Sequence, residues 1–185
     1  MRKDFGVHSW FYPLPVLIIG SYDENGTPDA MNAAWGGLYD SDKVVLCLSA
    51  GHKTTANIKQ KGAFTVSCAD AAHVAECDYL GVESGNKVPN KLEKAGFHAT
   101  KSAFVDAPII DELPVALECK LIKVNEDGNI IGQIVNISVD ESVVGENGKV
   151  DAAKLRAISY DPCTNTYVEM GGVVGKAFSD GLKLK

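Results

Sequence analysis

The segment 49–58 holds the residue types that a phosphate site needs. Ser49 and Thr54 supply hydroxyls. The neighbouring His52 and Lys53 supply positive charge, although a histidine contributes charge only when it is protonated. The segment also predicts the start of a helix, where unpaired amide N–H groups and the helix dipole attract an anion. The simpler alternative is an ordinary capped helix with a solvated lysine.

Residues 29–37 form a second candidate segment, in which small side chains predominate. The small residues are Ala33, Ala34, Gly36 and Gly37. Small side chains let the backbone approach a flat ring closely enough to hydrogen-bond its polar edge. Asn32 offers a donor and an acceptor, and Trp35 could form a wall of the pocket. The alternative is a hairpin strand whose small residues only pack against a helix.

A third segment, residues 84–91, could complete the same site. Ser84 and Gly85 could form a backbone nest, and Lys87 or Lys91 could reach an anion bound there. The alternative is a surface loop with solvated lysines. A flat ring over small residues, with a phosphate at a helix start, fits flavin mononucleotide (FMN) and implies redox chemistry.

The bulk composition describes one ordinary globular domain over residues 1–185, with 45% hydrophobic and 23% charged residues. The net charge of −6 argues against general affinity for nucleic acid or anionic membranes. No apolar stretch reaches the length of a membrane span, and the run 16–19 is too short for a signal peptide. We therefore expect a soluble, cytoplasmic protein with no nucleic acid or membrane partner.

The five cysteines predict neither a disulfide framework nor a metal site, because their number is odd and no C-x-x-C spacing occurs. They are Cys47, Cys68, Cys77, Cys119 and Cys163. We expect reduced, mostly buried thiols and no bound metal.

Short β-branched and aliphatic runs between turn residues predict most of the elements that must position these segments. The predicted strands cover residues 15–20, 29–34, 43–49, 63–68, 115–124 and 130–140. Turns at Asn25-Gly26 and at 125–129 join two pairs of them into hairpins. Because strands come in hairpins and do not alternate with long helices, the sequence favours an antiparallel barrel, mainly β with short helices.

The predicted helices are short and have recognisable ends. They are 54–61 with Thr54 as cap and Gly62 as stop, 71–80 with Asp70 as cap and Gly81 as stop, 91–95 ending at Gly96, and 152–158 with Asp151 as cap. The stretch 84–90 reads as a mobile loop. The glycine-containing tail, 160–185, is expected to pack on the barrel or on a dimer partner.

The order of these segments resembles the flavin reductase-like family of FMN-binding split-barrel proteins, and its flavoredoxin branch in particular. The matching stretches are 26–35, 52–58 with 62–64, 78–81 with Ser84, Gly85 and Lys91, and the tail stretches 167–171 and 175–178. The resemblance covers nearly the whole chain. It implies a six-stranded Greek-key split β-barrel that forms a homodimer, with FMN near the interface.

The resemblance also implies roles for the candidate segments. Residues 32–35 would lie along the flavin ring, and residues 49–54 would hold the phosphate and the ribityl chain. Many members carry arginine in the phosphate segment, whereas this chain has His52 and Lys53, so the identity of the cation stays open. The candidate cofactor-binding residues are Asn32, Ala33, Ala34, Trp35, Ser49, Ala50, His52, Lys53, Thr54, Ser84, Gly85 and Lys91.

Three functional hypotheses follow, and none assigns a catalytic side chain. In two of them the flavin itself supplies the redox chemistry, whereas the remaining one is a binding domain without a cofactor. The first is an oxidoreductase that moves electrons from NAD(P)H to flavin or to a redox partner. The second is a non-enzymatic flavoredoxin-type electron carrier, which partner proteins reduce and oxidise. No Gly-x-Gly-x-x-Gly fingerprint follows a strand, so a nicotinamide would bind only transiently.

Overall fold

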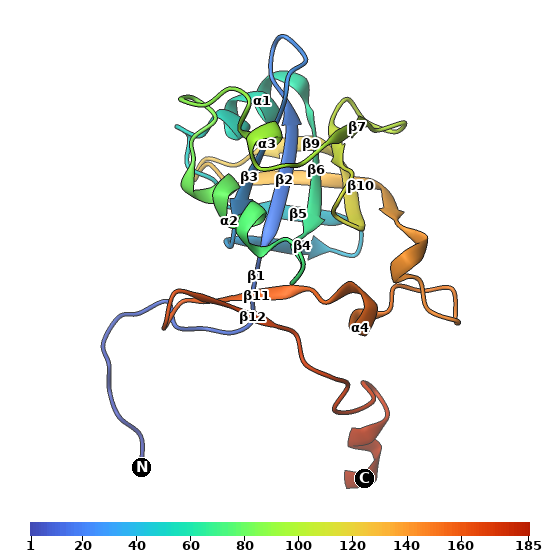
Figure 1. Ribbon diagram of the computed structural model, residues 1–185. Coiled ribbons are helices and arrows are strands. Elements are labelled where there is room, and N and C mark those ends of the chain that lie inside the picture. Colours follow the sequence, from blue (N-terminus) through green and yellow to red (C-terminus); the bar gives the residue numbers. More distant parts are fainter.

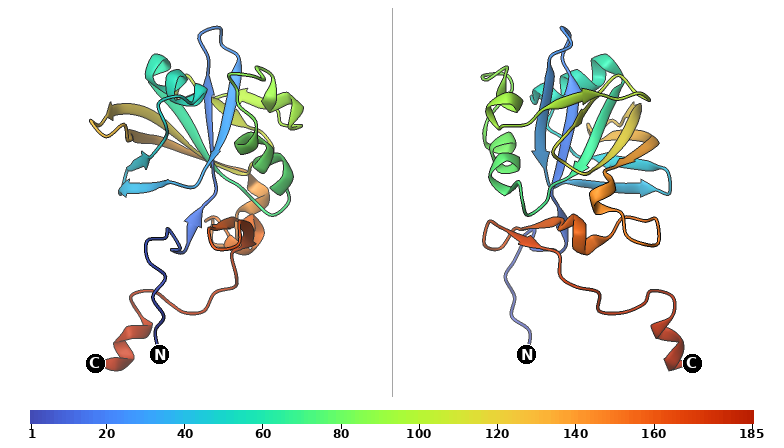
Figure 2. Two further views of the ribbon diagram at one scale, coloured as in Figure 1. Left: turned by 90° about the vertical axis from the view of Figure 1, so that its left-hand side faces the viewer. Right: turned by 45° about the vertical axis from the view of Figure 1, so that its right-hand side comes forward.

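A curled seven-stranded antiparallel sheet forms the centre of the computed structural model, which describes residues 1–185 (Figure 1). Its strands are β2 (Leu17–Tyr22), β3 (Pro28–Ala33), β4 (Gly36–Asp40), β5 (Lys43–Leu46), β6 (Ala63–Cys68), β9 (Val115–Val124) and β10 (Ile130–Val139). They pair in the order β3-β2-β6-β9-β10-β5-β4. Figure 2 shows the sheet curling into a half-barrel. This confirms the expected fold class, a mainly β split barrel with short helices.

The sheet buries apolar side chains on both of its faces, and β2 shows how. Ile18 packs into a cluster with residues of the helices α2 (Val74–Val82) and α3 (Lys91–Lys94). Leu17 and Ile19 pack into a second cluster with residues of β5 and β6. Successive strand residues point to opposite faces, so one strand contributes to both clusters. Each fully buried aliphatic side chain stabilises the fold by about 1.5–3 kcal/mol.

The two predicted hairpins are confirmed. β2 pairs with β3 from Leu17↔Ala33 to Tyr22↔Pro28. In the connecting turn, the Asp23 carboxylate accepts hydrogen bonds from the amides of Asn25 and Thr27, and Gly26 adopts the φ of 79° that the turn requires. The second hairpin joins β9 and β10.

The sheet has one strand more than the resemblance implies, because residues 36–40 form the edge strand β4. The sequence does not predict this strand, because the strand begins with two glycines and ends in an aspartate. Both residue types are disfavoured in strands. β4 pairs with β5, which ends at Leu46, earlier than the predicted 49. Only Ala34 and Trp35 separate the edge strands β3 and β4 in the chain.

Helix α1 (Lys53–Lys61) follows β5 and differs from the prediction at its start. His52, and not Thr54, is the N-cap residue, with extended backbone angles and no side-chain capping bond. The predicted stop is confirmed: Gly62 adopts a left-handed conformation, and its amide donates to the Ile58 carbonyl.

The other helices are α2 (Val74–Val82), α3 (Lys91–Lys94) and α4 (Ala152–Leu155). The prediction for α2 was wrong at both ends. Asp70 accepts hydrogen bonds from the amides of Ala72 and His73 at 3.0 Å, which forms a turn before the helix and not its cap. Gly81 lies inside the helix. No helix is long and apolar enough to span a membrane.

Asp151 caps α4 as predicted, through the amides of Ala153 and Lys154. The helix ends at Leu155, three residues before the predicted end, because Arg156 adopts a left-handed conformation with φ of 50°. Ile158 instead begins the next strand, β11.

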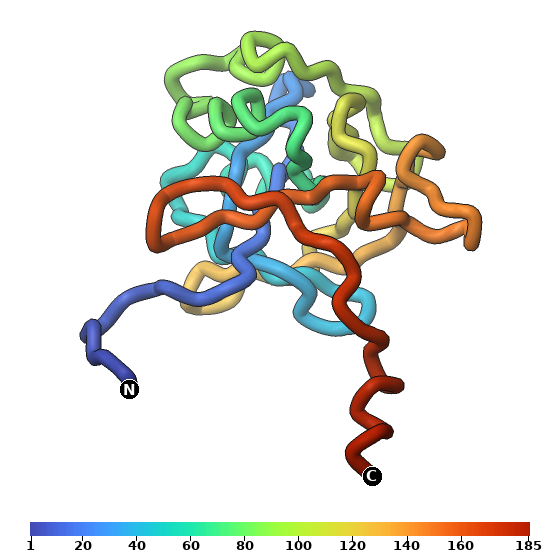
Figure 3. Tube along the Cα trace, turned by 60° about the horizontal axis from the view of Figure 1, so that its bottom comes forward, coloured from blue at the N-terminus to red at the C-terminus, as the bar shows by residue number.

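A small three-stranded sheet lies beside the barrel (Figure 1) and consists of β1 (Leu14–Pro15), β11 (Ile158–Asp161) and β12 (Thr166–Glu169). The remaining elements are β7 (Ala99–Lys101) with β8 (Pro108–Ile110), and the 3₁₀ turns η1 (Glu141–Val143) and η2 (Asp180–Leu184). Beyond β12 the chain runs away from the barrel (Figure 3), and Val174 and Phe178 are fully exposed. Packing of this end on a dimer partner therefore stays a prediction.

Candidate functional site

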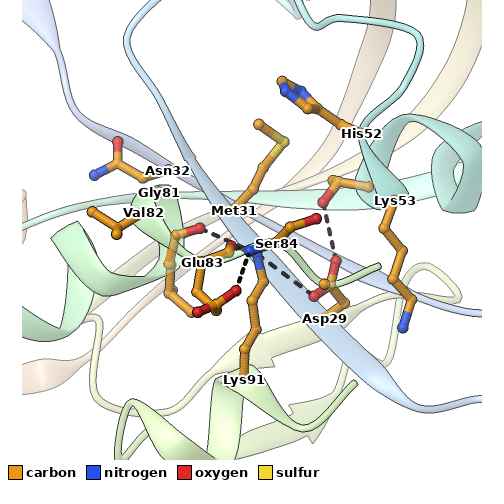
Figure 4. Close-up of a pocket in the computed structure, with 13 residues that line it drawn as sticks. Asp29, Met31, Asn32, His52, Lys53, Gly81, Val82, Glu83, Ser84 and Lys91 are labelled. Carbon is orange, nitrogen blue, oxygen red and sulfur yellow. Dashed lines mark hydrogen bonds and ion pairs between the residues drawn. The ribbon is translucent and has the colours of Figure 1, made fainter. Parts of the chain in front are cut away.

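One pocket gathers side chains from β3, the start of α1, the end of α2 and the loop that leads to α3 (Figure 4). Its volume is about 130 Å³. Of the candidate residues, those that line it are Asn32, His52, Lys53, Thr54, Ser84, Gly85 and Lys91. The pocket is smaller than the roughly 300–1,000 Å³ typical of sites for drug-sized ligands. A nucleotide-sized ligand would therefore fill it only in part.

The first turn of α1, which borders this pocket through Lys53 and Thr54, has unpaired donors. The amides of Lys53, Thr54 and Thr55 have no acceptor, and the N-cap residue His52 makes no side-chain capping bond. Backbone amides left free at a helix start need a partner, and the helix dipole makes an anion the favoured one. This end of α1 can therefore hold a phosphate through its backbone.

Lys53 does not direct its charge into the pocket. Its Nζ lies 3.2 Å from Asp23 Oδ2, and Figure 4 shows the amine pointing away from Met31 and Asn32. Burial would raise the pKa of the Asp23 carboxyl, but the Thr27 amide and then Lys53 hold that pKa below its ordinary value. His52 is exposed and forms no ion pair, so it is the cationic candidate that remains available.

Lys91 is held inside the protein by three oxygen partners. Its Nζ donates to the carbonyls of Leu80 and Glu83, both at 3.1 Å, and lies 3.9 Å from Asp29 Oδ1. Only 4% of the lysine side chain and 1% of the Asp29 side chain are exposed. Burial lowers the pKa of Lys91 and raises the pKa of Asp29, while the attraction between the two charges opposes both shifts. The charge of Lys91 is thus largely matched within the protein.

Asp29 is a residue of the site that the sequence analysis did not single out. Its Oδ2 accepts a hydrogen bond from the Thr54 hydroxyl at 3.2 Å, so this hydroxyl is already engaged. Its Oδ1 is buried and accepts no hydrogen bond. A Cβ added at Gly85 would lie only 2.6 Å from Oδ1, which requires glycine there. No local signal links Asp29 to Lys91, because the residues are far apart in the sequence.

Asn32 is anchored by two other elements. Its Nδ2 donates to the Cys77 carbonyl of α2 at 3.1 Å and to the Tyr167 hydroxyl of β12 at 3.5 Å. The Tyr167 hydroxyl in turn donates to Asp78 Oδ1 at 2.6 Å. Asp78 and Tyr167 are therefore further residues of the site that sequence reasoning gave no separate role.

The remaining candidates lie outside this pocket. Ala33 and Ala34 are half-buried, and 53% of Trp35 is exposed. Ser49 and Ala50 line a separate hollow of about 370 Å³ that also includes Thr55 of α1. The Trp35 carbonyl accepts the Cys47 amide at 2.9 Å, so the chain entering β4 and the chain leaving β5 lie side by side. The two candidate segments are therefore neighbours in space.

The cysteines form no disulfide, and no cluster of side chains suits a metal ion. Burial raises the pKa values of Cys77 and Cys119 to about 12, which keeps both as unreactive thiols. Cys47 and Cys163 are exposed and Cys68 is half-buried, so the expectation of mostly buried thiols was wrong.

A curled antiparallel half-barrel, with free amides at a helix start near the edge strand β3, defines a split-barrel protein with a candidate anion site. Residues 8–154 match the family described as "Flavin reductase like domain", and the chain therefore belongs to the flavin reductase-like family. This membership supports a flavin-binding redox protein as the class of molecule.

Solved structures agree with this assignment. Flavoredoxin of Desulfovibrio vulgaris (Miyazaki F) is 34% identical, with a TM-score of 0.94 over 98% of this chain and 100% of that one. A flavoredoxin from Methanosarcina acetivorans is 24% identical, with a TM-score of 0.88 over all of both chains. An FMN-binding domain of a flavin reductase-like enzyme from Shewanella baltica is 22% identical, with a TM-score of 0.77 over 88% of each chain. The latter two likenesses support the fold alone.

Proposed function

We propose that this protein binds FMN and moves electrons from NAD(P)H to flavin or to a redox partner. The observation that carries the proposal is the set of free amides at the first turn of α1, which face a pocket beside the small residues of the β3–β4 edge. A phosphate supplies the acceptors that these amides lack. FMN carries a phosphate and a flat ring, so the residues present fit this cofactor.

The phosphate end of FMN would be held by backbone amides and hydroxyls more than by lysine amines. The amides of Lys53, Thr54 and Thr55 are free, and the His52 side chain forms no capping bond. Ser49, Ala50, Ser84 and Gly85 would border the phosphate and the ribityl chain, with Lys91 acting through its contacts to Asp29 and to the loop.

The ring would lie along Asn32, Ala33, Ala34 and Trp35, where β3 passes into β4. Bound FMN supplies both hydride and single-electron transfer. The protein contributes small residues that admit the ring, backbone amides near its polar edge, and one face that remains open to a donor. The exposure of Trp35 and of the neighbouring β4 side chains Leu38 and Tyr39 is consistent with an open or partner-covered edge.

A flavoredoxin-type electron carrier is the second candidate. The similarity to flavoredoxin of Desulfovibrio vulgaris, at 34% identity over nearly the full length of both chains, favours it. In that case, protein donors and acceptors cycle the flavin, and NAD(P)H reacts slowly or not at all.

The proposed assembly is a cytoplasmic homodimer. The pocket of about 130 Å³ leaves most of a flavin outside it, and exposed apolar side chains of β4 and β10 lie on the same sheet. A second copy that covers this face would shield the ring. Sedimentation equilibrium of the flavin-loaded protein measures the assembly directly.

Anaerobic absorbance spectroscopy tests the proposed function. The purified protein is titrated with FMN and then with NADH or NADPH, with free FMN as the control. Protein-bound flavin bands that bleach with a nicotinamide faster than the control support the oxidoreductase. Bands that bind but bleach only with a protein donor support the carrier. Absence of flavin binding contradicts both.

A further inference from the structure

The amide of Asn32 is fixed in one orientation by two partners outside its own strand. The Cys77 carbonyl can only accept, so the Asn32 atom 3.1 Å from it is the nitrogen. The Tyr167 hydroxyl donates its hydrogen bond to Asp78 at 2.6 Å. Its oxygen can therefore accept one from Asn32 Nδ2 at 3.5 Å. Both hydrogens of Nδ2 are thus used within the protein.

The oxygen of Asn32 is consequently the group left for a ligand. Asn32 lines the pocket, and its Oδ1 forms no hydrogen bond within the protein. The backbone of Gly81 packs closely against Asn32, since a Cβ added at Gly81 would lie 3.1 Å from Asn32 Cβ. A flipped amide would place Oδ1 against the Cys77 carbonyl, which repels it.

Neither Tyr167 nor Asp78 lines the pocket itself. Tyr167 lies on β12, where it pairs with Tyr160 of β11, and Asp78 lies on α2. Burial and the Asp78 carboxylate raise the pKa of Tyr167, so its hydroxyl remains a donor to Asp78 at ordinary pH. The small sheet beside the barrel therefore contacts the site through the Tyr167 side chain.

We propose that Tyr167, held by Asp78, is a positioning residue that fixes Asn32 so that its oxygen accepts a hydrogen bond from an N–H or O–H group of the flavin. This inference rests on the proposed function. The donor is either the imide N–H of the ring or a ribityl hydroxyl, both of which are neutral. Asn32 then favours ligands that present a hydrogen-bond donor to its oxygen, and it disfavours ligands that present only acceptors there.

The test is a double-mutant cycle on FMN affinity, measured by quenching of flavin fluorescence. Asn32→Ala and Tyr167→Phe should each weaken FMN binding by roughly 2- to 10-fold, the effect of one neutral hydrogen bond. The double variant should bind no more weakly than Asn32→Ala alone, because Tyr167 acts through Asn32. Losses that multiply, or an unchanged affinity in either single variant, would overturn the inference.

Tyr160→Phe is the matched control, since Tyr160 lies opposite Tyr167 in the same sheet and its hydroxyl donates to Asn165, at the turn. It should leave FMN affinity unchanged. Asp78→Asn keeps an acceptor for Tyr167 and should retain affinity, whereas Asp78→Ala should lose as much as Tyr167→Phe. Thermal unfolding of each variant without FMN identifies any loss that comes from the fold.

An FMN methylated at the ring imide nitrogen identifies the donor group. If methylation weakens binding to the wild type but not to Asn32→Ala, the imide is the donor. If methylation affects both proteins equally while Asn32→Ala still weakens FMN binding, a ribityl hydroxyl is the donor. Failure of the wild type to bind FMN at all would contradict the proposed function, and that result is distinct from a cycle in which FMN binds but the two residues act independently.

Discussion

The amine of Lys53 forms an ion pair with Asp23, with 3.2 Å between Nζ and Oδ2, whereas the backbone amide of the same residue faces the pocket without a partner. The side-chain charge of Lys53 is thus paired within the protein, while its backbone N–H has no partner. Under the proposed function, this segment would hold the phosphate through its backbone, while the lysine side chain pairs with Asp23 in the β2–β3 turn. This division leads to a prediction that tests the two groups separately.

Lys53→Pro should weaken FMN binding by about 10-fold or more, because one charge-assisted hydrogen bond contributes about 1.5–3 kcal/mol. Proline is tolerated at the first helical position, and His52 before it already has the extended angles, φ −73° and ψ 138°, that proline requires. Lys53→Met, which removes only the charge, should change affinity by less than about fivefold. Isothermal titration with FMN measures both.

Riboflavin provides the ligand control for this pair of variants, because it lacks the phosphate. Lys53→Pro should bind riboflavin as the wild type does. Equal loss of riboflavin and FMN affinity would show that the substitution disturbs the ring site or the helix, and not a phosphate contact.

Removing one member of the Asp29–Lys91 pair should be costly, because the other charge stays buried. Lys91→Met alone should lower the free energy of unfolding by about 3–5 kcal/mol, because it leaves the Asp29 carboxylate buried without a cation. Asp29→Asn alone should cost less, because burial raises the pKa of Asp29 and so disfavours its charged form. The double variant should recover much of this loss. Urea unfolding at pH 7 measures the cycle. Additive losses in the double variant would indicate that the two charges do not depend on each other.

The same pair predicts a pH dependence of defined sign. Burial raises the pKa of Asp29 above its ordinary value of 3.8, so the folded state retains a proton that the unfolded state releases just above that pH. The contribution of Asp29 to stability therefore falls as pH rises from 3.8 through the folded pKa. The stability difference between Asp29→Asn and the wild type should shift in favour of the variant over this window. Urea unfolding across the window measures the difference, and a constant value would contradict the raised pKa.

Ala34→Leu should abolish most FMN binding while leaving the fold intact. Ala34 is half-buried between β3 and β4, where the ring is proposed to lie, and a larger side chain would occupy that space. Ala56→Leu, on the exposed side of α1, is the size-matched control. The flavin content of the purified variants and their melting temperatures report the outcome. Full occupancy in Ala34→Leu would remove this edge from the ring site.

Local signals explain how far the sequence could predict this protein. The turn at Asn25 and Gly26 and the stop at Gly62 depend on the residues themselves, so the hairpin and the end of α1 were confirmed. The predicted start of α1 was wrong because the Thr54 hydroxyl donates to Asp29 and does not cap the helix. No local rule reveals this distant partner. Such pairings between distant segments arise only when the sheet has folded.

The same reason limits the prediction of the site. His52, Lys53 and Lys91 all reach the pocket region as expected, yet the two lysines are matched by Asp23 and Asp29. Residue type indicates that a lysine can bind an anion, but the partner that it already has depends on the fold. The free amides of α1 follow from the helix start that the segment predicts, but the lack of a side-chain cap at His52 is seen only in the structure.

A crystal structure of the protein grown with FMN tests the central claim most directly. We predict that phosphate oxygens lie within about 3.2 Å of the amide nitrogens of Lys53, Thr54 and Thr55. We also predict that Lys53 keeps its contact with Asp23. A phosphate bound elsewhere, with these amides still without an acceptor, would contradict the account.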